Sequence, residues 1–314
     1  MSASNIKSCR LLEQYLSYLS VMKGRSENTI DEYRNDLLMF FRFVRHSRVP
    51  ENSDMEMSSI DIEFIKSITI HDMYCFIAGP DRGKKLSPST RARRIVSIRQ
   101  FWKYLKTKVH LIDNNIAEEL ETPKIPKRIP RYLNLEDSIR LLIKCEDSIR
   151  NHCILTIFLN CALRLSELTN IDIDQINGET LSVIGKGNKE RKIFLTPATK
   201  KALLDWMEVR KTMNPVCDAL FITKDGTRLT QRAIQDMVKK SIKAAGLDSK
   251  KISTHKLRHT AATLMYKYGK VDIRSLQQIL GHESIATTEI YTHLDENQLQ
   301  YAVNSNPLAT MFNT

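Results

Sequence analysis

Apolar residues recur every three to four positions through the first 121 residues, which is the spacing of one buried helical face. The pattern predicts a helix that carries Leu11 to Leu19 and stops near Gly24. A second helix is predicted to begin after Ser26, which can cap it, and to extend to about Val44. The chain therefore begins with amphipathic helices.

Two further start signals lie in the same region. Thr69 can open a short helix that ends near Gly79, and Ser87 followed by Pro88 predicts a longer helix that reaches about Lys108. The longer helix has an apolar stripe and a basic face, which suits either a solvated surface or contact with a polyanion. Residues 1–121 are predicted to form a helical domain.

Residues 122–131 have the sequence TPKIPKRIPR, in which three prolines alternate with basic residues. Because proline fixes φ and prevents a helix from continuing, this segment is predicted to be an extended linker between two domains. Its basic side chains could lie along a phosphate backbone, although a solvated linker explains them almost as well.

The second predicted domain, residues 132–314, mixes helices with strands. Helical spacing covers Leu135–Cys145 and Arg150–Ala162, whereas Leu181–Ile184 and Lys192–Leu195 are predicted as strands joined by the glycine-rich run GKGNKER. This run lacks the Gly-x-x-x-x-Gly-Lys-Ser/Thr order of a phosphate-binding loop, so an ATP-dependent function has no support. We expect a mainly helical, mixed α+β domain with a small antiparallel sheet.

Composition narrows the class of protein. The chain has 314 residues, enough for two domains, and a formal charge of +12 that both domains share. This charge indicates a polyanionic partner, although it can also serve solubility. Six cysteines without a Cys-x-x-Cys pair are typical of reduced core residues, and we find no signal peptide or membrane span. We therefore expect a cytoplasmic, nucleoid-associated protein that does not bind a membrane.

Six side chains of the second domain can together break a phosphodiester without a metal or another cofactor. A tyrosine supplies a nucleophile, and planar guanidinium groups can neutralise the non-bridging oxygens of a phosphate. These residues are Arg164, Lys186, His255, Arg258, His282 and Tyr291. A zinc site at His255 and His259 is disfavoured because residue 256 is Lys where the metalloprotease pattern requires Glu.

The runs GKGNKER, HKLRHT and LGH, with Tyr291 nine residues beyond the last, resemble the active-site boxes of the tyrosine recombinases of the phage integrase family, and most of all its Xer-type members. The likeness covers most of residues 132–314. Over residues 1–121 it depends on helical pattern and charge alone. It implies a SAM-like core-binding domain followed by the recombinase catalytic domain.

The resemblance also implies roles for the residues. Tyr291 would attack phosphorus and form a 3′-phosphotyrosine, His255 would accept its proton, and Lys186 would protonate the departing 5′-oxygen. Arg164 and Arg258 would clamp the phosphate, with a further hydrogen bond from His282, while Glu167 and His259 would support these groups. Where most relatives have glycine, this chain has Ala162, which we expect to be tolerated because alanine suits a helix.

DNA contacts are expected along the basic face of the helix 88–108 and along the linker. The candidate residues are Arg91, Arg94, Arg99, Lys103, Lys124, Lys127 and Arg128. Double-stranded recombination sites are the implied partner, bound by a homotetramer or by a heterotetramer with a second recombinase. A DNA translocase or accessory proteins are further possible partners.

The apolar tail after Tyr291 is expected to dock on the next protomer, or back on its own domain. Its residues are Leu294, Leu299, Ala302, Val303, Leu308, Met311 and Phe312. The implied function is exchange of DNA strands through a Holliday junction, in chromosome-dimer resolution or in the integration, excision or inversion of mobile elements. Two alternatives are a nicking and relaxing enzyme of topoisomerase IB type and a non-catalytic DNA-binding protein.

Overall fold

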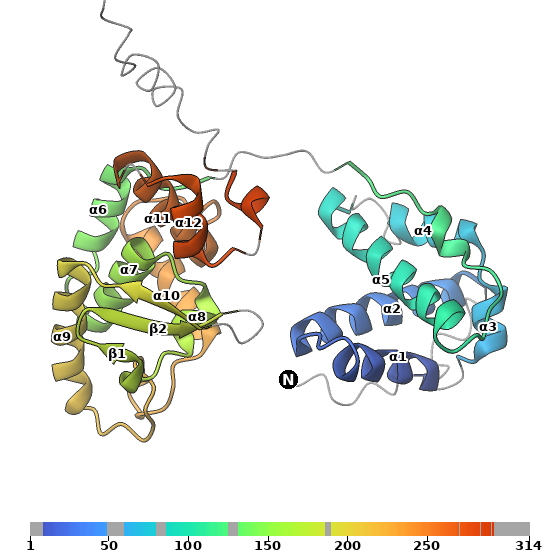
Figure 1. Cartoon of the computed structure of the whole chain (residues 1–314), viewed down its shortest axis with the longest axis horizontal. Helices are drawn as coiled ribbons and strands as arrows, with labels where there is room; N and C mark the ends of the chain where they lie inside the picture. The colour runs from blue at the N-terminus through green and yellow to red at the C-terminus, as the bar shows by residue number, and fades with distance from the viewer. Residues whose placement is uncertain are drawn as a thin grey trace, which may run out of the picture. The chain divides into compact units, whose positions relative to one another are not determined.

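The computed structural model describes residues 9–48, 60–79, 86–124, 131–185, 190–269, 271–282, 284–289 and 291. The chain separates into two compact units, Met1–Lys127 and Arg128–Thr314 (Figure 1). This boundary falls inside the predicted linker, while the proposed domain limits remain predictions. Across the described residues, no helix combines the length and apolar character needed to cross a membrane.

The regular elements that the structure describes in the first unit are all helices. Its elements are α1 (Arg10–Val21), α2 (Glu27–Arg48), α3 (Ile62–Ser67), α4 (Ile70–Ala78), α5 (Pro88–Thr107) and the 3-10 helix η2 (Ile116–Glu119). Because α2 packs against α1, α4 and α5, the apolar stripes of these helices meet in one core. Phe40, Phe41, Phe101 and Trp102 lie at its centre and are almost fully buried.

Polar side chains begin these helices at the predicted places. Thr69 and Asp72 form a capping box at the start of α4, and Ser87 caps α5 directly before Pro88. Both predicted helix starts are confirmed. The sequence did not reveal α3, which Asp61 caps, because its six residues are too few to show a periodic stripe.

The second unit combines helices with one small sheet (Figure 1). Its helices are α6 (Leu135–Ile143), α7 (Ile149–Cys161), α8 (Leu165–Thr169), α9 (Pro197–Lys211), α10 (Gln231–Ala244), α11 (Thr254–Gly269), α12 (Ile273–Leu280), and the 3-10 helices η3 (Ile173–Gln175) and η4 (Ile285–Thr287). The nearly buried α7 packs against both α9 and α11. This central helix therefore places its C-terminal end beside α11.

The sheet has three antiparallel strands in the order β1 (Ile176–Asn177), β2 (Thr180–Ile184) and β3 (Glu190–Phe194). Leu181 pairs with Ile193 and Val183 with Arg191, which sets the face that each side chain occupies. The two predicted strands and the predicted mainly α fold with a small antiparallel sheet are confirmed. The two-residue β1 is too short to have been predicted.

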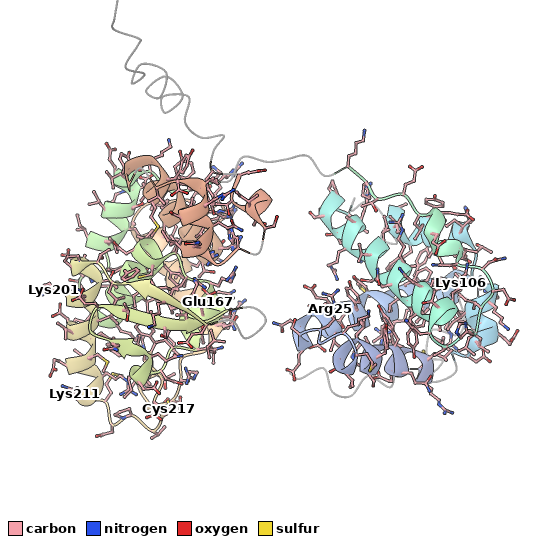
Figure 2. The ribbon with its side chains drawn as sticks, viewed as in Figure 1. Arg25, Lys106, Glu167, Lys201, Lys211 and Cys217 are labelled. Carbon is pink, nitrogen blue, oxygen red and sulfur yellow. The ribbon has the colours of Figure 1, made fainter. Side chains whose placement is uncertain are left out.

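All six cysteines are free. Four of them are buried, in agreement with the expectation of core residues, whereas Cys75 and Cys217 are only half-buried. Those two residues correct the prediction in part, because their helix and loop positions leave the sulfur near the surface. Figure 2 shows Cys217 among the side chains of the second unit.

Candidate active site

Arg164 is positioned by the end of α7. The helix ends at Cys161, and Ala162 adopts a left-handed conformation with φ 50° and ψ 36°. The expectation that alanine suits this position because of its helix propensity is wrong, since Ala162 lies just outside the helix. Arg164 then begins α8, where its backbone N–H donates to Glu167 Oε2 at 2.7 Å. The turn thus aims the Arg164 side chain away from α7.

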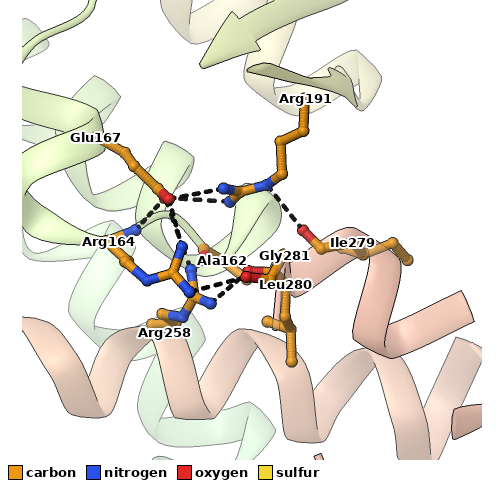
Figure 3. A network of polar contacts seen from close by, with 8 residues as sticks. All are labelled: Ala162, Arg164, Glu167, Arg191, Arg258, Ile279, Leu280 and Gly281. Atoms are coloured by element: carbon orange, nitrogen blue, oxygen red, sulfur yellow. Dashed lines mark hydrogen bonds and ion pairs between the residues drawn. The ribbon is translucent and has the colours of Figure 1, made fainter. Parts of the chain in front are cut away.

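Glu167 holds the arginines of the site together (Figure 3). It accepts hydrogen bonds from Arg164 Nη1 at 2.6 Å and from Arg191 Nη1 and Nη2 at 2.6 and 3.1 Å, while Arg258 Nη1 lies 3.6 Å away. Burial pushes the pKa of Glu167 upward, but the bonds from Arg191 and Arg164 outweigh it and lower that pKa. The carboxylate is therefore ionised at neutral pH.

Arg258 projects from α11 into the interior and is only 3% exposed. Its Nη1 donates to the carbonyl of Ala162 at 2.7 Å, and its Nη2 donates to the carbonyl of Leu280 at 2.6 Å. Burial, followed by the charge of Arg164, lowers the pKa of Arg258 to about 10. The group stays a cation at neutral pH, and it connects the C-terminal ends of α7 and α12.

Arg164 also contacts the end of α12, since its Nη2 donates to the carbonyl of Gly281 at 3.0 Å. Gly281 ends α12 in the left-handed conformation, which glycine adopts without strain. His282 follows, and its Nδ1 lies 2.9 Å from Thr288 Oγ1. Burial and the charge of Arg258 lower the pKa of His282 to about 4, so the ring is neutral at physiological pH.

Tyr291 is 1% exposed and packs against Ala162, Leu280 and their apolar neighbours. Its hydroxyl lies 2.7 Å from Nδ1 of His259. Burial raises the pKa of Tyr291 to about 12, although the charge of Arg258 opposes this rise. Tyr291 therefore lies close to Arg258, but its phenol is withdrawn from solvent and protonated.

The two histidines of α11 occupy different environments. His259 is half-buried and contacts Tyr291, whereas His255 is exposed, with its ring centroid 4.7 Å from that of His259. Burial and the neighbouring histidine lower the pKa of His259 to about 4, and desolvation and the charge of Arg258 lower the pKa of His255. Both rings can therefore accept a proton. The contact to the phenol belongs to His259, which was expected only to support other residues.

The structure thus brings together most of the predicted set. The residues that meet here are Arg164, Glu167, His255, Arg258, His259, His282 and Tyr291. Lys186 lies outside the described residues. Arg191 and Thr288 were not predicted to belong to the site. Arg191 could have been suspected from its place at the end of the run GKGNKER, whereas no signal in the sequence indicates Thr288.

The predicted DNA contacts of α5 differ in their surroundings. Arg94 is 7% exposed, and its guanidinium lies 4.5 Å from the centre of the Phe76 ring. Arg99 donates to the carbonyl of Leu120 and to Ala117 at 3.4 Å. Arg99 therefore fastens the segment around η2 to α5, and its contact with DNA stays a prediction.

Lys103, unlike these two arginines, is exposed to solvent. It lies at the edge of a pocket of about 600 Å³, together with Lys23, Arg25 and Lys108. Arg25 is labelled in Figure 2. Of the other candidates, Arg91 is half-buried and Lys124 exposed, while Lys127 and Arg128 lie outside the described residues. A basic concave surface of this kind suits a polyanion.

Known proteins resemble both units. Residues 131–298 match the phage integrase family, and residues 12–108 match the phage integrase N-terminal SAM-like domain. A tyrosine recombinase XerC from Caldanaerobacter subterraneus subsp. tengcongensis is 46% identical over 308 residues, which cover 95% of this chain and 87% of that relative. None of these matches supports the topoisomerase alternative.

Two solved structures share the fold. The post-cleavage complex of the XerH site-specific recombinase with a palindromic difH substrate has a TM-score of 0.66 at 22% identity, over 94% of this chain and 84% of that chain. A lambda integrase tetramer bound to a Holliday junction has a TM-score of 0.66 at 16% identity, over 90% and 76% of the two chains. The chain therefore belongs to the phage integrase family, as a tyrosine recombinase of Xer type that recombines DNA at specific sites by cleavage and rejoining.

Proposed function

We propose that Tyr291 is the nucleophile of this recombinase and that Arg164 and Arg258 hold the scissile phosphate. The phenolic oxygen forms a bond to phosphorus as the bond from phosphorus to the 5′-oxygen breaks. This leaves a 3′-phosphotyrosine and a free 5′-hydroxyl. The observation that carries the proposal is the packing of Tyr291 against Ala162 and Leu280, whose carbonyls bind Arg258.

The phenol must leave its buried place before it can reach DNA. Its hydroxyl is bonded to His259 and 1% of the residue is exposed, so no phosphate can approach that oxygen. We assign His259 to holding the resting phenol, and exposed His255 to accepting its proton when DNA is bound. Lys186 remains the proposed acid for the 5′-oxygen.

A covalent trapping experiment tests these assignments. On a nicked duplex site, Tyr291→Phe should bind DNA with an affinity within about threefold of the wild type, because it removes one hydroxyl and none of the cations that neutralise phosphates. It should form no covalent complex. Replacing His255 by Gln should slow cleavage by about 10²–10⁴-fold, the usual contribution of a general base.

The matched variant is His259→Gln, which removes the imidazole that holds the phenol and leaves His255 in place. We expect this variant to slow cleavage less than tenfold. Loss of a general base slows a reaction by at least about 10²-fold, and the proposed base His255 is still present. Covalent complex formation by Tyr291→Phe would refute the nucleophile. Loss of cleavage in His259→Gln, with normal cleavage in His255→Gln, would reverse the two histidine roles.

The proposed assembly is a tetramer on two DNA sites, which exchanges one pair of strands, passes through a Holliday junction and then exchanges the second pair. Support comes from the fold shared with an integrase tetramer on such a junction. A second recombinase and a DNA translocase are proposed partners if the role is chromosome-dimer resolution; integration or excision of a mobile element is the alternative. The predicted tail contact lies outside the described residues.

Trapping the protein on nicked candidate sites from its own genome separates these roles. Covalent complexes confined to one chromosomal site would support dimer resolution. Complexes at the ends of a mobile element would support integration and excision instead.

A further inference from the structure

Arg191 lies where three segments of the second unit meet (Figure 3). It comes from β3, its Nη atoms bind Glu167 in α8, and its Nε donates to the carbonyl of Ile279 in α12 at 3.2 Å. Each neighbouring segment carries a residue of the proposed site. Glu167 also binds Arg164, and the end of α12 leads into His282.

The register of the sheet explains how Arg191 reaches this position. Arg191 and Ile193 are two residues apart on β3 and so share one face of the sheet. Ile193 is buried in the core of the unit, opposite Leu181. Arg191 therefore points inward as well, and only 14% of its side chain is exposed.

The contact with Glu167 has the form of a specific bond and not of a surface ion pair. Glu167 is 2% exposed, and two guanidinium nitrogens reach its two oxygens. Bidentate arginine–carboxylate pairs fix orientation as well as distance, and lysine cannot reproduce this geometry. Arg191 consequently fixes the orientation of the Glu167 carboxylate that binds Arg164.

The stem of Arg191 also lies against the turn before His282. A Cβ atom placed on Gly281 would come 3.2 Å from Arg191 Cδ and 3.3 Å from Nη1. Gly281 has φ +61°, so both the backbone conformation and the close approach favour glycine there. The guanidinium thus packs on the turn whose carbonyls bind Arg164 and Arg258.

We propose that Arg191 is a positioning residue for cleavage, which holds Glu167 and the turn 279–281 so that Arg164 and His282 face the same phosphate. Arg191 itself needs no contact with DNA in this role. The inference rests on the proposed clamp function of Arg164 and Arg258, and it adds a residue that orients the clamp.

The test uses the full-length protein and Arg191→Lys, which keeps the charge and loses the bidentate geometry. Single-turnover cleavage is measured on a nicked duplex with an ordinary scissile phosphate and on one with a neutral methylphosphonate. With phosphate, we expect cleavage to slow by about 10–10²-fold, less than the roughly 10²–10³-fold effect of removing a donor to the transition state outright, because Arg191→Lys only misorients the donors. DNA affinity should change by less than about threefold, the effect of a weak surface contact.

With methylphosphonate, the variant should cleave within about threefold of the wild type, because a neutral centre leaves less charge for an oriented guanidinium clamp to stabilise. A purely structural defect would slow both substrates equally. Lys192→Ala, which alters an exposed residue of the same strand, is the control and should cleave both like the wild type. Glu167→Gln provides a second variant, with the same expected contrast, if Arg191→Lys does not fold.

Arg164→Ala separates the two proposals. If methylphosphonate does not relieve the defect of Arg164→Ala, the proposed clamp is wrong. If it relieves Arg164→Ala but not Arg191→Lys, or if Arg191→Lys cleaves phosphate at the wild-type rate, the clamp survives and the role of Arg191 is refuted.

Discussion

Individual residues of the site are held by charges and carbonyls inside the protein. The guanidinium of Arg258 is bound to main-chain carbonyls of two helix ends, and Glu167 neutralises the arginines around it. A buried arginine without such partners would pay a large desolvation penalty. The same partners that make burial tolerable therefore hold the guanidinium of Arg258 in one position.

Substitutions of Ala162 test how the left-handed turn after α7 affects the free energy of unfolding. Its methyl group is buried at a left-handed position, so Ala162→Gly loses about 0.8 kcal/mol of apolar burial and relieves a backbone cost of about 1–2 kcal/mol. Chemical denaturation should show the free energy of unfolding unchanged or raised by up to about 1 kcal/mol. Ala162→Val should destabilise by more than about 2 kcal/mol, because a branched residue neither fits nor favours this conformation.

A helix-propensity argument predicts the opposite sign for the first variant, a loss of about 1 kcal/mol. That result would show that the left-handed turn does not govern this position.

The lowered pKa values of the half-buried His259 and His282 predict a dependence of stability on pH. The folded protein lowers the pKa of His259 and of His282 to about 4, below their ordinary value of 6.5. The unfolded chain therefore binds protons more tightly than the folded protein does. The contribution of the neutral rings to stability is complete above pH 6.5 and is lost as the pH falls toward 4. The thermal midpoint should drop from pH 7 to pH 5.

The double variant His259→Gln/His282→Gln should show a smaller drop over the same interval. An equal drop in wild type and variant would mean that other groups, such as His255, whose pKa is also lowered in the folded protein, dominate this dependence.

Among the elements, α5 shows how one helix can combine internal and external cations. Arg99 binds carbonyls around η2 and Arg94 lies over Phe76, whereas Lys103 faces the pocket beside Lys108. All three residues were predicted to contact DNA. Their partners indicate that the two arginines stabilise the first unit, and that Lys103 is the better candidate for phosphate contact.

Replacing Lys103 and Arg99 should therefore have different effects. Lys103→Ala should weaken binding to all DNA sequences alike and reduce the slope of log affinity against log salt by about 1, as expected for one phosphate contact. It should leave thermal stability unchanged. Arg99→Ala should lower stability by about 1–3 kcal/mol, because it leaves buried carbonyls without a donor.

Fluorescence anisotropy over a range of salt concentrations, with thermal unfolding of the free protein, measures both effects. A salt slope that changes only in Arg99→Ala would assign the DNA contact to Arg99 instead.

For the whole molecule, two basic units on one chain explain why a polyanion is the substrate. The formal charge is +12, and the second unit contains a phenol, neutral imidazoles and guanidinium groups. These groups can supply a nucleophile, a proton acceptor and charge stabilisation for phosphoryl transfer. With Lys186 as the proposed acid for the 5′-oxygen, the proposed chemistry requires no metal ion.

Chelation tests this expectation directly. Covalent complex formation on a nicked site should proceed in EDTA within about twofold of the rate without chelator, once ionic strength is matched, because salt alone alters DNA affinity. Loss of the complex in EDTA, and its return with Mg²⁺, would show that a divalent cation takes part in cleavage.

The sequence by itself determined the helical first unit, the mixed second unit, the recombinase family and most members of the site. Periodicity, capping residues and motif spacing are local properties, so they can be read without coordinates. The proposed role of Arg191 could not be predicted, because it depends on a strand register that brings this residue to Glu167 and Gly281.

Only the tertiary structure decided which of several residues of the same type takes each position in the site. It placed His259 and not His255 on the phenol, buried the side chain of Tyr291, and made Ala162 a left-handed turn residue. These outcomes follow from packing between α7, α11 and the end of α12, segments far apart in the chain. Burial and contacts between distant segments set protonation and orientation, and neither quantity is written in local spacing.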